Sequence, residues 1–79
     1  MEVNQCVSKL KQGGYEVLSH RQGLNGGVIE VQDGFVSTQF TVPTLPEVVE
    51  VKNGQRRLVK PARYNGHMVL FVSDDNKEQ

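Results

Sequence analysis

Apolar side chains in the first dozen residues recur at helical spacing. The positions i, i+3, i+4 and i+7 are apolar, namely Val3, Cys6, Val7 and Leu10. A glycine pair at 13–14 follows directly, and glycine readily takes the left-handed conformation found just after a helix. The pattern predicts a helix over about residues 3–12. A helix this short is unstable alone in water, so we expect its apolar stripe to pack on a sheet.

From residue 15 onward, the spacing of apolar side chains changes to the alternation typical of strands. We expect about six short strands. The first four lie at 15–20, 28–32, 35–42 and 47–52, a fifth starts near 55, and the last covers 68–72. The last strand, MVLFV, is apolar on both faces, which indicates a central position in the sheet.

Three dipeptides signal tight hairpin turns, because Asp-Gly and Asn-Gly readily take the positive φ that such turns need. They are Asp33-Gly34, Asn53-Gly54 and Asn65-Gly66. Counting outward from the first turn opposes Val31 to Val36. Counting outward from the second opposes Glu50 to Arg57, a pair that we expect to form a cross-strand ion pair.

These elements together predict an α+β fold. It has one short N-terminal helix packed on a curved antiparallel sheet or small barrel of about five to six strands. The length of 79 residues allows one domain. We place that domain at residues 1–73 and expect a flexible polar tail at 74–79.

Composition excludes several classes of protein. Nine basic and nine acidic side chains leave the chain formally neutral, which argues against a wholesale polyanion binder. The single cysteine, Cys6, excludes an intrachain disulfide framework and a multi-cysteine zinc site, and we expect no metal or cofactor. No apolar run approaches the roughly 20 residues that span a bilayer, and the opening MEVNQC is unlike a secretion signal. A cytoplasmic protein without membrane contact is therefore expected.

One segment departs from this neutral composition, because no acidic residue lies between Val51 and Ser73. The candidate binding residues there are Lys52, Arg56, Arg57, Lys60, Arg63, Tyr64 and His67. Cationic side chains beside an aromatic ring can neutralise phosphate and stack a base. Strand alternation separates Arg57 from Arg56 and Lys60, which predicts a basic rim with solvated charges. The alternative is a solvated strand whose charges face Glu47, Glu50 and the acidic tail at Asp74, Asp75 and Glu78, and that alternative stays open.

The two histidines, His20 and His67, raise the question of acid–base cleavage of RNA, because paired imidazoles can take and donate the protons of that reaction. The segment LKQGGYEV, with Ser19-His20 after it, resembles the opening of HicA-type mRNA-cleaving toxins. The resemblance implies a short helix, a glycine and a histidine on a small sheet. It covers about 20 residues and ends where a second helix would be required, so no residue's role is carried over.

Three further features have structural interpretations. Cys6 lies on the apolar helix stripe, where a thiol is a small core residue rather than a nucleophile. The glycine-rich segment 23–27 leads into a strand, whereas a phosphate loop leads into a helix. The segment TVPTLPE, at 41–47, ends a polar strand that either accepts a partner strand or uses its prolines to prevent such pairing.

Small size, neutral charge and the lack of a catalytic constellation favour a non-enzymatic interaction module. We expect an accessory or inhibitory protein that binds a macromolecular partner, with protein favoured over nucleic acid, and we expect self-association into a homodimer. The alternative is a nucleic-acid-binding β-domain that uses the basic segment at 52–67. A small ribonuclease that uses His20 and His67 is the least favoured class.

Overall fold

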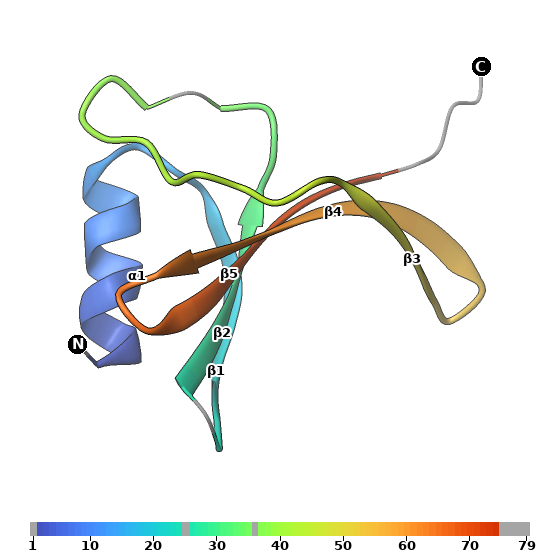
Figure 1. Ribbon diagram of the computed structural model, residues 1–79, viewed down its shortest axis with the longest axis horizontal. Coiled ribbons are helices and arrows are strands. Elements are labelled where there is room, and N and C mark those ends of the chain that lie inside the picture. Colours follow the sequence, from blue (N-terminus) through green and yellow to red (C-terminus); the bar gives the residue numbers. More distant parts are fainter. Residues whose placement is uncertain (1, 25, 36, 75–79) are drawn as a thin grey trace.

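A computed structural model describes residues 2–24, 26–35 and 37–74 of the chain (Figure 1). The elements are α1 (Val3–Gln12), β1 (Val17–Gly23), β2 (Gly26–Gln32), β3 (Val48–Lys52), β4 (Gln55–Tyr64) and β5 (His67–Asp74). The strands form one sheet in the order β1-β2-β5-β4-β3, and α1 packs on one of its faces. The predicted α+β class, with its short N-terminal helix, is confirmed. Residues 75–79 of the predicted tail lie outside the described residues, whereas Asp74 ends β5.

The sheet is mixed rather than fully antiparallel, because β2 and β5 run parallel. The hairpin predicted at Asp33-Gly34 is therefore wrong. Val31 pairs with Val17 on one side and with Phe71 on the other, so no edge of β2 is left for the segment after the turn. Val36, its predicted partner, lies outside the described residues. The apolar β5 buries β2 better than the polar segment 37–39 could, which explains the outcome.

The expected strand at 35–42 is instead part of a long connection between β2 and β3 that folds over the C-terminal end of α1 (Figure 1). Ser37 organises this loop. Its buried hydroxyl donates to the carbonyl of Gly13 at 2.8 Å and accepts the N–H of Gln39 at 3.1 Å. The parallel strands β2 and β5 are joined by a crossover that consists of this loop, β3 and β4, because a tight turn can only reverse the chain.

The core lies between α1 and the sheet. The predicted helix stripe is confirmed, since Cys6 and Leu10 are fully buried and Val7 nearly so. From the sheet, Ile29 and Val69 face the helix and are equally inaccessible. The helix is too short to be stable alone, so its packing against the apolar side chains of the sheet stabilises it.

The two Asn-Gly turns fold as predicted. Asn53 and Asn65 have φ values of 54° and 51°, and the glycine after each also has a positive φ. Positive φ at both central residues defines the type I′ turn that matches the twist of paired strands. The turn at Asn53 sets Glu50 opposite Arg57, as predicted.

The sheet does not close into a barrel, so β1 and β3 are its two edges. The β3–β4 hairpin extends away from α1 and from the rest of the sheet (Figure 1). The predicted central position of the last strand is confirmed, since β5 lies between β2 and β4.

Candidate functional site

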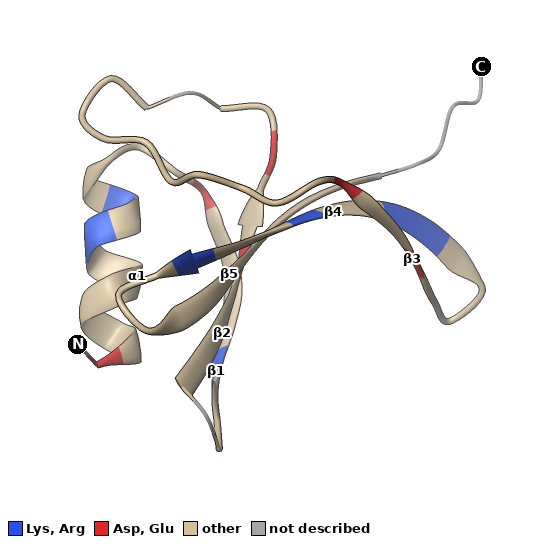
Figure 2. Ribbon diagram, viewed as in Figure 1, with Lys and Arg blue, Asp and Glu red and all other residues tan. Residues whose placement is uncertain are grey.

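The predicted binding residues lie along β4 and its two flanking turns rather than in one cluster. Figure 2 shows the basic positions of β4 strung out from the projecting hairpin to the helix side of the sheet. Arg56 and Arg63 are exposed, whereas Arg57 and Lys60 are half-buried. Lys52 is the last residue of β3 and pairs with Gln55, and its side chain lies outside the part of the chain that the structure describes. The structure therefore does not bring the predicted residues together on one surface.

Arg57 is committed to two carboxylates of its own chain. Its two terminal nitrogens contact Glu30 on β2 at 3.2 and 3.3 Å, and its Nε donates to Glu50 on β3. The hydrogen bonds that Arg57 donates to the Glu30 carboxylate, followed by the one it donates to Glu50, raise the pKa of Arg57 above its usual value. The side chain of Arg57 is 21% exposed, so the predicted solvated head is wrong for this residue. The predicted ion pair with Glu50 is confirmed.

Lys60 also faces a carboxylate. Its Nζ lies 3.2 Å from Oδ2 of Asp33, the residue that follows β2. Among the described residues, Arg63 has no carboxylate partner. Two of the basic side chains thus face carboxylates of the chain, which offset their positive charge. The alternative interpretation of the basic segment named Glu50 as a partner, whereas it did not name Glu30 or Asp33.

The two histidines have different environments. His67 is 6% exposed, and its Nδ1 accepts the backbone N–H of Gly27 at 2.7 Å. This bond joins the second residue of β2 to the first residue of the parallel strand β5. His20 is exposed on the edge strand β1. His67 therefore serves the fold, and its Nδ1 lone pair is already occupied.

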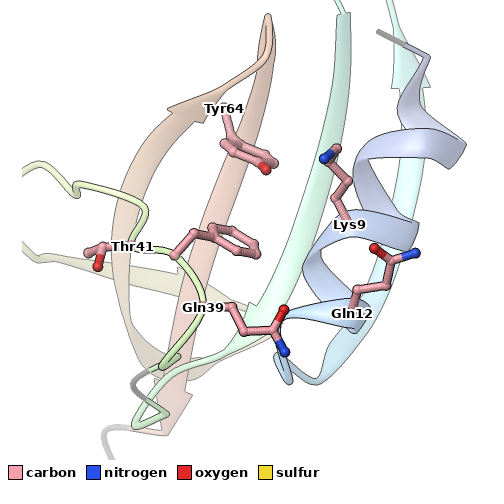
Figure 3. Close-up of a pocket in the computed structure, with 6 residues that line it drawn as sticks. Lys9, Gln12, Gln39, Thr41 and Tyr64 are labelled. Carbon is pink, nitrogen blue, oxygen red and sulfur yellow. The ribbon is translucent and has the colours of Figure 1, made fainter.

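Tyr64 lines a hollow that sequence reasoning missed (Figure 3). The hollow has a volume of about 310 Å³ and is lined by Lys9, Gln12, Gln39, Phe40, Thr41 and Tyr64. The ring of Phe40 stacks on Tyr64 at 5.7 Å between centroids, with 9° between the ring planes. In Figure 3, Lys9 and Tyr64 extend toward each other from opposite sides of the hollow. No sequence signal indicated it, because the loop that carries Phe40 was expected to be a strand.

The most unusual surface of the described chain is the outer edge of β3. Half of the exposed large apolar side chains fall within residues 45–51, namely Leu45 at 61% exposure, Val48 and Val49 at 51%, and Val51 at 66%. We call these four residues the β3 apolar edge. Strand alternation puts Val48 on one face of the hairpin and Val49 and Val51 on the other. The sequence contained the signal, because Val-Val-Glu-Val lacks the regular polar positions of a solvated edge strand.

The backbone of β3 is open on the same side. Lys52 and Gln55 flank the two-residue turn, so they form a hydrogen-bonded pair, as do Glu50 and Arg57. The N–H and C=O groups of Val49 and Val51 consequently point away from β4. A strand laid along this edge would find both a hydrogen-bonding row and apolar side chains.

Several kinds of site are absent from the part of the chain that the structure describes. Its His, Cys, Asp and Glu side chains form no group of three or more that could hold a metal ion. Nor does it contain a helix with the length and apolar character that a membrane crossing requires.

The chain matches no protein-family model, no curated protein and no solved structure.

Proposed function

We propose that this chain is a non-enzymatic interaction module that binds a protein partner through the β3 apolar edge. The observation that supports the proposal is the gathering of Val48, Val49 and Val51 on an edge strand with outward-facing main-chain groups, together with Leu45 shortly before that strand. Exposed apolar surface beside an unpaired strand edge is typical of sites that take up a partner strand. Such a module acts as an accessory or inhibitory subunit.

The form of the hairpin favours this function. β3 and β4 extend beyond the body of the sheet, so a partner can reach β3 without contact with α1 (Figure 1). The hairpin is held at the middle of β3 by Arg57, which contacts Glu50 on β3 and Glu30 on β2. An edge held in place before binding loses less conformational freedom when a partner docks.

Nucleic-acid binding by the segment 52–67 is the alternative, and the contacts favour it less. Arg57 and Lys60 face carboxylates, and one face of the Tyr64 ring is covered by Phe40. The neutral formal charge of the chain gives no long-range attraction to a polyanion.

We further propose a cytoplasmic setting, where a single buried thiol such as Cys6 stays reduced.

Affinity capture from the source cells tests the proposal when it compares matched variants. The double variant Val49→Lys/Val51→Lys places charges on the β3 apolar edge, whereas Leu24→Lys changes a more exposed apolar side chain on the β1–β2 turn. We expect a partner that is captured by the wild type and by Leu24→Lys and lost with the β3 variant. Direct titration of the purified pair should show at least a tenfold loss of affinity, about 1.4 kcal/mol. Equal binding by both variants would refute the assignment of the edge.

A further inference from the structure

We infer that the hollow beside Tyr64 is a binding site for a small carboxylate that also carries hydroxyl groups, such as a sugar acid (Figure 3). The inference is independent of the proposed function, because the hollow lies beside α1, whereas the β3–β4 hairpin extends away from that helix (Figure 1). Its volume of about 310 Å³ lies at the lower end of the range for small-molecule sites, about 300–1,000 Å³, which suits a molecule of one ring.

Three segments that are distant in the sequence form the walls of the hollow. Helix α1 supplies Lys9 and Gln12, the loop after β2 supplies residues 39–41, and Tyr64 ends β4. The thiol of Cys6, on α1, donates to the backbone carbonyl of Tyr64 at 3.7 Å. This bond fixes the helix wall to the strand wall before any ligand arrives, which lowers the conformational entropy lost on binding.

The loop wall is also held in place. The buried hydroxyl of Ser37 donates to the carbonyl of Gly13 at 2.8 Å, and it accepts the N–H groups of Gln39 and Phe40 at 3.1 and 3.4 Å. A Cβ at Gly13 would lie 2.5 Å from Cε1 of Phe40, so the ring of Phe40 fills space that only glycine leaves open. The aromatic part of the lining is therefore preorganised.

Lys9 gives the hollow one positive charge. Its side chain is exposed, and no carboxylate of the described residues contacts its Nζ. Among the described residues that line the hollow, none is acidic. A single ammonium matches the single charge of a carboxylate, whereas a phosphate monoester carries about −1.5 to −2 at neutral pH and would leave an excess of negative charge. The lining therefore favours a carboxylate over a phosphate.

The neutral polar side chains of the lining favour hydroxyl groups on the ligand. Gln12, Gln39 and Thr41 are exposed, and their side chains form no hydrogen bond within the described part of the chain. Amides and hydroxyls both donate and accept, as the hydroxyl groups of a sugar also do. An aromatic acid would take these groups out of water without giving them partners, which costs affinity. The aromatic carbon of Phe40 and Tyr64 meanwhile offers an apolar surface to the C–H groups of a sugar ring.

A titration followed by heteronuclear NMR tests the site, with D-glucuronate as the probe. The backbone amide signals of residues 9–12, 39–41 and 64 should shift and should saturate at millimolar concentration, because one exposed ion pair and a few hydrogen bonds give modest affinity. Three further probes each change one feature of the ligand. D-glucose lacks the charge, glucose 6-phosphate exchanges the carboxylate for a phosphate, and benzoate lacks the hydroxyl groups. Each of them should bind at least tenfold more weakly than glucuronate.

The role of the charge is tested with two lysines of the same helix. Lys9→Met removes the charge and keeps most of the apolar stem, so the affinity for glucuronate should fall at least tenfold, while that for glucose should stay unchanged. Lys11→Met is the matched control, because Lys11 also lies exposed in the last turn of α1 but does not line the hollow. This control should bind glucuronate like the wild type. An equal loss in both variants would overturn the assignment of Lys9.

The role of the hydroxyl groups is tested on the loop. Gln39→Ala should weaken the binding of glucuronate several-fold and leave the weaker binding of benzoate unchanged, whereas Thr38→Ala, at an exposed position outside the lining, should change neither. Glucose 6-phosphate or benzoate that binds as tightly as glucuronate would overturn the ligand class. The absence of saturable shifts with glucuronate would overturn the site. None of these variants alters the β3 apolar edge, so such a result leaves the proposed function standing.

Discussion

The guanidinium of Arg57, on β4, contacts both carboxylate oxygens of Glu30, on β2, although β5 lies between the two strands. The distances are 3.2 and 3.3 Å, and the Glu30 side chain is only 13% exposed. A planar fork of this kind is specific to arginine, because lysine offers a single point charge. Arg57 thereby joins the body of the sheet to the hairpin that carries the β3 apolar edge.

Removal of Arg57 should destabilise the fold. Arg57→Met leaves the largely buried carboxylate of Glu30 without its fork, and we expect a loss of about 1–3 kcal/mol in the free energy of unfolding. Arg57→Lys should recover only part of it. Urea denaturation measures the loss, with Arg63→Met as the control because Arg63 is exposed and should stay within about 0.5 kcal/mol of the wild type. Equal midpoints for the two variants would show that the Arg57 cluster is only a surface feature.

The loop after β2 gives a second prediction. Ser37→Ala should cost about 1–2 kcal/mol, because the hydroxyl that accepts two backbone N–H groups and donates to Gly13 is buried. Thr38→Ala, at the exposed neighbouring position, should be nearly neutral. Thermal unfolding of both variants checks this expectation. A larger effect at Thr38 would favour the strand that the alternation of the sequence predicted.

Local signals decided how much of this fold the sequence could predict. The helix and the β3–β4 register follow from patterns only a few residues apart, a stripe of apolar positions and an Asn-Gly turn. The parallel pairing of β2 with β5 joins residues 40 apart, such as Ile29 and Val69, and no local rule encodes it. Asp33-Gly34 has the local sequence of a hairpin turn. The chain does not fold back on β2 there, because the distant strand β5 pairs with β2 instead.

The candidate site shows the same division. Arg57 and His67 were predicted as binding residues from their types and neighbours in the sequence. Their roles in the fold depend on Glu30 and Gly27, which are distant in the chain. The segment 47–52 was predicted as a strand but not as an edge, since strand order determines which strand lies outermost. Composition along the chain thus located the charged segment, whereas only the topology identified the exposed edge.

The thiol of Cys6 predicts a loss of stability at alkaline pH. Burial raises the pKa of Cys6 above its ordinary value of 9.0, and its Sγ donates to the carbonyl of Tyr64 at 3.7 Å. The unfolded chain therefore loses this proton at lower pH than the folded chain does, so the contribution is intact below pH 9 and is lost as the pH rises further. Urea midpoints between pH 7 and 10 should fall more steeply for the wild type than for Cys6→Ala. Parallel curves would contradict the burial of the thiol.

Measurements of nucleic-acid affinity discriminate between protein binding through the β3 apolar edge and nucleic-acid binding through the segment 52–67. With Arg57 and Lys60 facing carboxylates, the contacts that remain are too few for tight binding, since each phosphate contact contributes separately to the salt dependence. We expect mobility-shift titrations with single-stranded RNA and DNA to show weak binding that disappears near physiological salt. The double variant Arg56→Ser/Arg63→Ser should then behave like the wild type in partner binding, because neither residue belongs to the β3 apolar edge. Tight, steeply salt-dependent binding that this variant abolishes would transfer the function from the strand edge to the segment 52–67.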